Sequence, residues 1–201
     1  MTQEAIQEII RKQRNYFYTG ATLNIDFRIT ALKKLQTSIQ SHQEQINAAL
    51  KSDLGKSSFE SYMCESGLVL SEITYMLSKE KTVHTPLAQF HSRSYMKPSP
   101  YGVTLIMSPW NYPFLLTFDP LVDAIAAGNT AVLKPSAYSP ATSNIICEIV
   151  RECFPEEYVA VVMGGRQENS CLLQEHFDYV FFTGSQAVGK EVMRHASEHL
   201  T

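Results

Sequence analysis

Apolar residues in the first 80 positions recur at intervals of three and four, the repeat that places them on one side of an α-helix. Two such stripes come first: Ile6, Ile9, Ile10, Gln13 and Phe17, then Ile29, Leu32, Leu35 and Ile39. Ser57 is followed three positions later by Glu60, a capping-box pattern that predicts a third and longer helix. The apolar side of this third helix is expected to hold Phe59, Tyr62, Leu70, Ile73 and Leu77. The first 80 residues therefore predict three amphipathic helices.

Prolines interrupt the helical pattern between Lys81 and Pro100. They are Pro86, Pro98 and Pro100, and each removes a backbone N–H that a helix needs. Residues 92–96 (SRSYM) are compatible with a short strand inside this connector. We therefore assign residues 1–100 to N-terminal helices and a connector, and residues 101–201 to a segment of different character.

Short, continuous apolar runs dominate the chain from Gly102 onward. They are residues 103–107, 130–133, 158–163 and 179–182, and each is followed by a loop and a helical pattern. Gly128 is expected to be a helix C-cap, and Ser139 an N-cap before Pro140. Apolar strands that alternate with helices are typical of a parallel sheet covered on both faces. The sequence thus predicts an α/β fold with a parallel sheet, preceded by an N-terminal helical segment.

Composition and charge exclude several classes of protein. With 44% hydrophobic and 18% charged residues, the chain is typical of an ordinary globular protein. Its net charge of -3 supplies no basic excess, so nucleic acid is not an expected partner. No apolar stretch predicts a signal peptide or a membrane span. Four cysteines without CxxC spacing favour a reducing, cytoplasmic location: Cys64, Cys147, Cys153 and Cys171.

In a parallel α/β sheet, ligands bind outside the carboxyl ends of the strands, where the loops converge. The loops expected at that edge are residues 108–113, 134–140, 164–169 and 183–189. Gly184 and Ser185 directly follow a strand and Gly189 lies at a helix start, so backbone amides there could approach a phosphate while Gly189 permits close packing. The motif is not a full GxGxxG, and taken alone an ordinary glycine turn explains it better.

Three further residues at the strand ends are candidates for chemistry. Lys134 could donate hydrogen bonds to ribose hydroxyls or a phosphate, although a lysine in such a loop is ordinarily a solvated charge. Asn111 could donate from its amide to a developing oxyanion, and the alternative is an Asx turn. Trp110, the single tryptophan, either lines the pocket or packs beneath the loop. The sequence leaves each pair of alternatives open.

The remaining polar and sulfur-containing residues are interpreted as structural. Glu65 is expected to face solvent or to cap the packing of the helical part. Cysteines without a base nearby in sequence are expected to be small buried hydrophobes. These are Cys64, Cys147 and Cys153, while the pairs Cys171/His176 and His195/His199 lack the spacing or third ligand of a metal site. No metal site is predicted.

Taken together, the segments form a pattern that no single motif provides. They are DLGKSSFESYMCESGLVLSEITYML, SPWNYPF, DPLVDAIAAGNTAVLKPS, VVMGG and FDYVFFTGSQAVGK. In this order, over nearly the whole chain, they resemble the NAD(P)-dependent aldehyde dehydrogenases, in particular the branch that oxidises fatty and aromatic aldehydes. The resemblance implies a Rossmann-like cofactor domain, and oxidation of an aldehyde to a carboxylic acid through a thioester on a cysteine.

The resemblance also implies roles for individual residues. Asn111 matches the oxyanion-stabilising asparagine, and Lys134, with Ser136 in the same segment, matches the lysine that holds the adenosine ribose. The expected cofactor loops and pocket wall are formed by Trp110, Gly164, Gly165, Gly184, Ser185 and Gly189. NAD is the implied cofactor. Ala137 stands where the family commonly has a ribose-binding glutamate, so NADP is expected to be tolerated alongside NAD.

The segments that carry the family's nucleophilic cysteine and general-base glutamate have no counterpart in these 201 residues. Because hydride transfer needs the thiolate to attack the aldehyde first, this chain alone is expected to be inactive. It is interpreted as the N-terminal, cofactor-binding part of such an enzyme, with an aldehyde as substrate of the complete enzyme and homo-oligomers as a further expectation. The alternatives are a non-catalytic dinucleotide-binding module and a self-associating truncated remnant.

Overall fold

A parallel four-stranded sheet forms the centre of the molecule, which is seen here in a computed structural model describing residues 1–79, 87–89, 92–94 and 98–201. The strands lie in the order β5-β4-β3-β6. Their bounds are β3 Val103–Met107, β4 Thr130–Lys134, β5 Val159–Val161 and β6 Tyr179–Phe182. The predicted alternation of strands and helices is confirmed by the order of the elements. The predicted parallel sheet is confirmed because all three neighbouring strand pairs are parallel.

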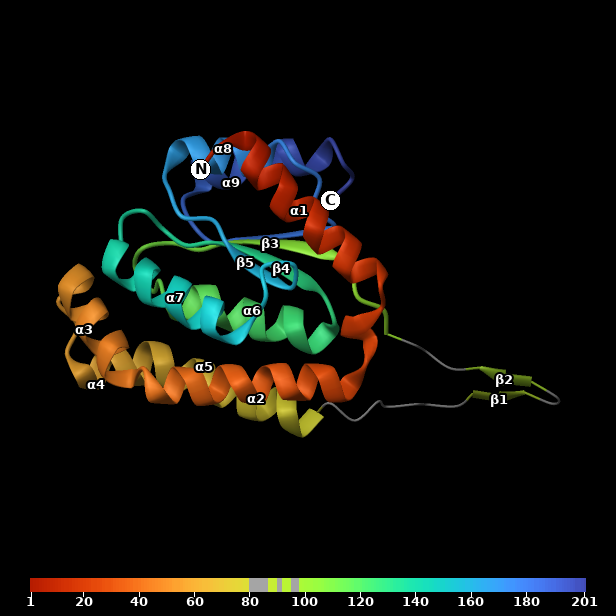
Figure 1. The fold of residues 1–201 in the computed structure, drawn as a ribbon, viewed down its shortest axis with the longest axis horizontal. Coiled ribbons are helices and arrows are strands. Elements are labelled where there is room, and N and C mark those ends of the chain that lie inside the picture. The colour runs from red at the N-terminus through yellow and green to blue at the C-terminus, as the bar shows by residue number, and fades with distance from the viewer. Residues whose placement is uncertain (80–86, 90–91, 95–97) are drawn as a thin grey trace.

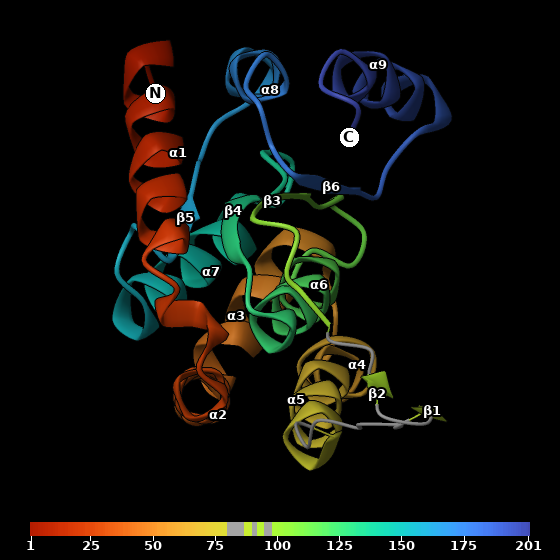
Figure 2. The same cartoon turned by 90° about the vertical axis from the view of Figure 1, so that its right-hand side faces the viewer.

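Helices cover both faces of the sheet (Figure 1). On one face lie α1 (Gln3–Tyr18), α8 (Arg166–Leu173) and α9 (Gln186–Ser197). On the other lie α6 (Leu115–Ala127) and α7 (Pro140–Cys153), with a further layer outside them. That layer consists of α2 (Ile25–Ser41), α3 (Gln43–Leu54), α4 (Ser58–Ser61) and α5 (Gly67–Lys79). Figure 2, turned by 90°, shows the N-terminal helices divided, with α1 on one side of the sheet and α2 to α5 on the other.

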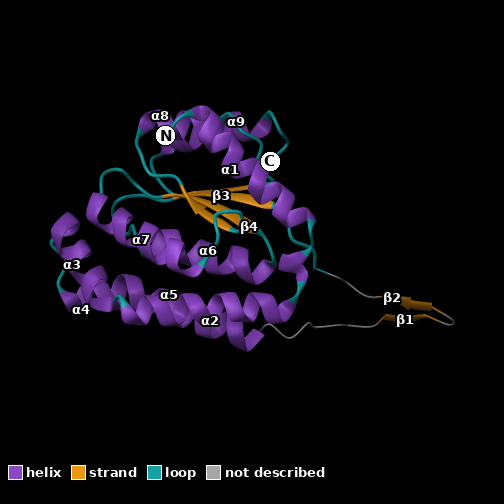
Figure 3. Cartoon of the chain, viewed as in Figure 1, coloured by secondary structure: helices purple, strands orange, loops and turns teal. Residues whose placement is uncertain are grey.

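Short elements complete the described chain. A 3-10 turn, η1 (Ala21–Leu23), joins α1 to α2. A two-stranded antiparallel hairpin of β1 (Leu87–Gln89) and β2 (Ser92–Ser94) projects from the body (Figure 3). The strand expected over residues 92–96 is confirmed for its first three residues, while Tyr95 and Met96, like Pro86 of the connector, lie outside the described residues.

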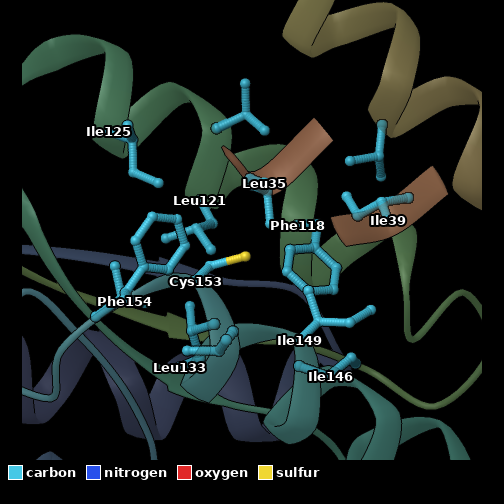
Figure 4. Packing of buried hydrophobic residues seen from close by; sticks show 14 of the residues in the cluster. Leu35, Ile39, Phe118, Leu121, Ile125, Leu133, Ile146, Ile149, Cys153 and Phe154 are labelled. Atoms are coloured by element: carbon cyan, nitrogen blue, oxygen red, sulfur yellow. The ribbon is translucent and has the colours of Figure 1, made fainter. Parts of the chain in front are cut away.

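The larger hydrophobic core fills the space between the sheet, α6 and α7, and the outer helical layer. Figure 4 shows Leu35 and Ile39 of α2 meeting Phe118 and Leu121 of α6, with Leu133 of the sheet below them. A second core lies under α1, α8 and α9 on the opposite face. Cys147 and Cys153 are buried small hydrophobes, as expected, whereas Cys64, for which the same was expected, is only half-buried. Gln13, on the first stripe, is also buried, and its amide donates to the Ala131 carbonyl oxygen at 2.7 Å.

The predicted third helix is interrupted by a π-helical turn, η2 (Tyr62–Ser66), between α4 and α5. Its expected start is confirmed, since Ser57 and Glu60 form the reciprocal capping box. Its expected apolar side is wrong at the N-terminal end, where Phe59 is 74% and Tyr62 49% exposed. A π turn holds an extra residue, so it rotates the preceding residues away from the face that Ile73 buries. The separate helix α3 was also not predicted.

Helix ends agree with the sequence in part. Gly128 is the C-cap of α6 in the left-handed conformation, at φ 91°, as expected. Ser139 precedes α7 at the N-cap position, but its side chain makes no capping hydrogen bond. Asp53 of α3 does this instead, accepting from the Ala141 and Thr142 amides at 3.2 and 2.7 Å. The N-terminus of α7 is therefore capped by a carboxylate from a distant helix.

Candidate cofactor-binding site

The carboxyl ends of the strands lie level with one another at one edge of the sheet. Met107 of β3 is in register with Lys134 of β4 and with Phe182 of β6. Backbone hydrogen bonds extend this ladder into the loops, since the Ser108 amide donates to the Lys134 carbonyl at 3.2 Å and the Thr183 amide to the Met107 carbonyl at 3.1 Å. The loops predicted from the sequence to converge are thus brought to a common edge, on the left of Figure 1.

Two helices that begin at this edge have their first turns filled by carboxylates. Asp53 caps α7, and Glu65 of η2 caps α6 by accepting from the Phe114 and Leu115 amides, both at 2.9 Å. A carboxylate at a helix N-terminus satisfies free amides and offsets the helix dipole. Because these positions are occupied by the protein itself, α6 and α7 offer no free first-turn amides for an anionic ligand.

The start of α9 is different. Ser185 is its N-cap, and the Ser185 hydroxyl accepts from the Val188 amide at 3.4 Å. Residues 184–188 are exposed, and helix geometry leaves first-turn amides without intrahelical partners. Among the helices that the structure describes at this edge, α9 is the one that begins without a carboxylate on its first turn. This end of the helix can accept an anion.

Gly184 and Gly189 are both close to the ring of Phe182, but not equally. A Cβ atom on Gly184 would lie 2.6 Å from the Phe182 ring, whereas one on Gly189 would lie 3.5 Å away, an ordinary contact. Gly189 was expected to permit close packing, but the space beside it would also hold a Cβ atom, so the packing does not depend on glycine there. Gly184, by contrast, has a packing reason of its own to be glycine.

A matched pair of substitutions follows from this difference. We expect Gly184→Ala to lower the free energy of unfolding by about 1–2 kcal/mol, because the Phe182 ring must move. Gly189→Ala should raise it by up to about 1 kcal/mol, since alanine is the better helix former and meets no obstacle. Urea denaturation of both variants beside the wild type measures the two shifts. Equal destabilisation by both would contradict the packing described.

Lys134, at the end of β4, is buried and not a solvated surface charge, with 3% of its surface exposed. Its ammonium donates to the carbonyl oxygens of Pro135 and Gly164, at 2.9 and 2.7 Å. Burial lowers the pKa of Lys134 to about 8, and the nearby Glu168 carboxylate partly opposes that shift. Within this site, Lys134 therefore links the loop after β4 to the loop after β5 through hydrogen bonds that a ligand hydroxyl could share.

The glycine loop after β5 is shaped by Glu168 of α8. Gly164 has φ 138°, and a Cβ atom there would lie 2.3 Å from the Glu168 carboxyl group. Glu168 accepts from the Gly165 amide at 2.8 Å and from the N-terminal amine of Met1 at 2.7 Å. Hydrogen bonds, the largest from this amine, lower the pKa of Glu168 to about 2. Gly164 is thus required by the capping contact, whatever ligand the loop binds.

The loop after β3 presents its polar side chains to solvent. Trp110 is 54% exposed, so it does not pack beneath the loop. Asn111 is also exposed, and its side chain makes no hydrogen bond to any residue that the structure describes, so the Asx-turn alternative does not hold. Its backbone carbonyl accepts from the Lys56 ammonium at 3.0 Å. The amide of Asn111 is therefore available to a ligand.

The remaining sequence candidates have structural surroundings. Ser136 is half-buried, and its hydroxyl accepts from the Tyr138 amide at 3.2 Å within the loop after β4. The rings of His176 and His199 lie 5.0 Å apart between centroids, with their planes tilted by 34°. Within the described ranges, no three His, Cys, Asp or Glu side chains are grouped so that they could hold a metal ion. None of the helices in those same ranges has the length and apolar character needed to cross a membrane.

Comparison with known proteins identifies the family. The model of the aldehyde dehydrogenase family matches residues 1–201. The chain belongs to the aldehyde dehydrogenase family. It is 44% identical to 4,4'-diaponeurosporen-aldehyde dehydrogenase of Staphylococcus aureus, over 97% of this chain and 44% of that protein. It is 40% identical to aldehyde dehydrogenase family 3 member B3 of Mus musculus, over 98% of this chain and 43% of that one.

Solved structures agree with this assignment. A substrate-bound Staphylococcus aureus AldH superposes with a TM-score of 0.92 at 43% identity, covering 98% of this chain and 44% of its own. A glyceraldehyde-3-phosphate dehydrogenase of Methanocaldococcus jannaschii, complexed with NADP, shares the fold with a TM-score of 0.81 at 20% identity, over 98% and 44% of the two chains. This aldehyde dehydrogenase chain thus spans about 44% of the length of these relatives.

Several residues that organise this aldehyde dehydrogenase site were missed by sequence reasoning. Glu65 is fully buried, so the expectation that it faces solvent is wrong, and it caps α6 together with an ion pair to Lys56. Asp53 and Glu168 cap α7 and α8 in the same way. An acidic residue at the start of a helix is a recognisable signal for Glu168, but nothing local in the sequence marks Asp53 or Glu65 as caps of other helices.

Proposed function

We propose that this chain is the N-terminal, cofactor-binding part of an NAD(P)-dependent aldehyde dehydrogenase. The complete enzyme would convert an aldehyde and NAD(P)+ to a carboxylic acid and NAD(P)H. One observation carries the proposal: α9 begins with exposed first-turn amides that no carboxylate caps, at the same sheet edge as the buried ammonium of Lys134. Because β4 and β6 flank β3, the strands that carry the two features are roughly 10 Å apart, and a dinucleotide can extend across that width of the sheet edge.

The residues present suit a dinucleotide with a diphosphate and two riboses. The first-turn amides of α9 would hold the diphosphate, as helix N-termini do elsewhere. The Lys134 ammonium would donate to the adenosine ribose hydroxyls in exchange for one of its backbone carbonyl partners. Gly164 and Gly165 leave the neighbouring loop without side chains that would obstruct this approach. When bound, NAD(P)+ would supply the hydride acceptor.

Asn111 is proposed to act on the aldehyde itself. Its exposed amide can donate to the oxygen that gains negative charge when a nucleophile attacks the carbonyl carbon. A preorganised donor of this kind stabilises the transition state more than the ground state. The nucleophile and the general base would belong to residues outside this chain, so these 201 residues alone should show no aldehyde oxidation.

Titration of the chain with NAD and then NADP, followed by the fluorescence of Trp110, tests the proposed cofactor site. Trp110 is the single tryptophan, so a saturable change reports on the loop after β3 without ambiguity. We expect saturation with both dinucleotides. No fluorescence change together with no heat in calorimetry would contradict the proposal and would favour a remnant without cofactor affinity.

Ala137 is expected to set the tolerance for NADP. It is exposed in the loop after Lys134, where a carboxylate would repel a 2′-phosphate. Ala137→Glu should therefore raise the Kd for NADP by about tenfold or more while leaving the Kd for NAD within about threefold. Ala137→Gln is the matched neutral control and should leave both values nearly unchanged. An equal effect of glutamate on both dinucleotides would contradict this explanation.

Location and assembly belong to the same proposal. All four cysteines are free, which suits a reducing compartment such as the cytoplasm. A similar enzyme from Canis lupus familiaris, 38% identical over 98% of this chain and 45% of its own, is described as dimeric and NADP-preferring. We therefore expect self-association, and light scattering after size exclusion would give the number of copies.

A further inference from the structure

We propose that Lys56 and Glu65 are positioning residues for Asn111. The Lys56 ammonium forms an ion pair with the fully buried Glu65 carboxylate and also donates to the Asn111 carbonyl oxygen at 3.0 Å. The inference rests on the proposed role of Asn111 as the oxyanion donor. It adds that the Lys56–Glu65 ion pair, which lies outside the sheet, holds this donor in place.

The ion pair of Lys56 and Glu65 fixes the loop after β3 at two points. At its end, Glu65 accepts from the Phe114 and Leu115 amides at 2.9 Å and so holds the first turn of α6. Three residues earlier, Lys56 holds the peptide unit of Asn111 and lies 4.1 Å above the Tyr112 ring. Because one ion pair joins both anchors, the direction of the Asn111 side chain is coupled to the start of α6.

The π turn explains how Glu65 reaches this position. In η2 the Gly67 amide donates to the Tyr62 carbonyl, five residues earlier, and the extra residue turns Glu65 inward while Tyr62 points outward. A Cβ atom on Gly67 would lie 2.6 Å from that backbone carbonyl oxygen. Backbone cannot yield as a flexible side chain can, so the turn depends on glycine here. Single π turns inside helices often occur at functional positions.

The ion pair is sheltered enough to act as a firm anchor. The Lys56 side chain is 15% exposed and that of Glu65 is not exposed at all. Among the described residues, the Lys56 ammonium donates to the Glu65 carboxylate and the Asn111 carbonyl, and it also makes a cation–π contact with the Tyr112 ring. An exposed pair would be weakened by solvent and contribute little, whereas a buried, hydrogen-bonded pair resists separation.

Substitution of Lys56 by methionine in the 201-residue chain tests the proposal by NMR relaxation. Lys56→Met removes the link to the Asn111 carbonyl but keeps the length of the side chain. We expect the ¹⁵N order parameter of the Asn111 backbone amide to fall from about 0.85 to below about 0.6, the range of flexible backbone. In Glu65→Gln, we also expect hydrogen exchange at the Phe114 and Leu115 amides to accelerate about tenfold.

Asp53→Asn is the matched control, because Asp53 caps α7 in the same way and its hydrogen bonds within the described part of the chain go to Ala141 and Thr142, not to the loop after β3. It should leave the Asn111 order parameter unchanged. An unchanged value in Lys56→Met, or an equal fall in both variants, would overturn the proposal. Since the measurement needs no cofactor, its result is separate from the NAD titration, and failure of one does not imply failure of the other.

Discussion

Replacement of Lys134 by methionine is expected to make the chain more stable and its cofactor site weaker. Burial lowers the pKa of this lysine from 10.5 to about 8, a difference worth about 3 kcal/mol against the folded state below pH 8. Methionine removes that cost but leaves the Pro135 and Gly164 carbonyls without their donor. We therefore expect the free energy of unfolding at pH 7 to rise by up to about 1 kcal/mol net, because each carbonyl left without a donor costs about 1 kcal/mol or more.

The lowered pKa of Lys134 also predicts how the free energy of unfolding changes with pH. Between pH 8 and 10.5 the lysine stays protonated in the unfolded chain while it loses its proton in the folded one. The unfolded state then binds more protons, so the stability of the wild type should rise across this interval. In Lys134→Met that rise should disappear. Urea denaturation at intervals of half a pH unit measures the difference between the two proteins.

Lys33→Met is the matched control, since Lys33 is exposed on α2. It should leave both the stability and its pH profile close to those of the wild type. The Kd for NAD should rise at least about tenfold in Lys134→Met, because a charge-assisted hydrogen bond to ribose is lost. A variant that is less stable than the wild type at every pH, or that binds NAD equally well, would contradict the role given to Lys134.

Replacement of Glu65 by alanine is expected to be the most destabilising single change at this site. It leaves the Phe114 and Leu115 amides without an acceptor and the Lys56 ammonium without its counter-charge. Breaking a buried pair by removing one partner costs about 3–5 kcal/mol. That is a large share of the roughly 5–15 kcal/mol by which a domain is stable. The loss should appear as a lower midpoint in urea denaturation.

Glu60→Ala provides the comparison for Glu65. Glu60 lies five residues earlier and also caps a helix, accepting from the Ser57 amide at 3.0 Å, but in an exposed position. Loss of an exposed cap costs about 1 kcal/mol. The Glu65 variant should therefore lose several times more stability than the Glu60 variant. Similar losses in both would show that burial and the ion pair with Lys56 add little.

The sheet could be predicted from the sequence because burial on both faces gives its strands a recognisably apolar composition. A strand covered on both faces is apolar at most positions, and residues 103–107 and 130–134, buried throughout, are apolar except at Thr104, Thr130 and Lys134. Helix stops at glycine are equally local, as Gly128 illustrates. These features depend on residues within one or two turns, so one short stretch of sequence is sufficient to predict them.

The contacts that organise the strand-end loops could not be predicted in this way. Glu65 meets the Phe114 amide across 49 positions, and Asp53 meets the Thr142 amide across 89. No local pattern in the sequence identifies a partner so far away along the chain. Lys134 stays a predicted cofactor-binding residue, and its burial was not predicted, because the Pro135 and Gly164 carbonyls that accept from its ammonium come together only in the folded chain.

The strand-end loops of this chain are expected to bind a dinucleotide. A ¹H–¹⁵N correlation spectrum recorded during titration with NAD tests it residue by residue. If the loops bind NAD, progressive and saturable chemical-shift changes are expected at the amides of residues 185–188, at Gly164 and Gly165, and at the Trp110 indole. Unchanged spectra at millimolar NAD, or shifts confined to residues away from this edge of the sheet, would contradict it.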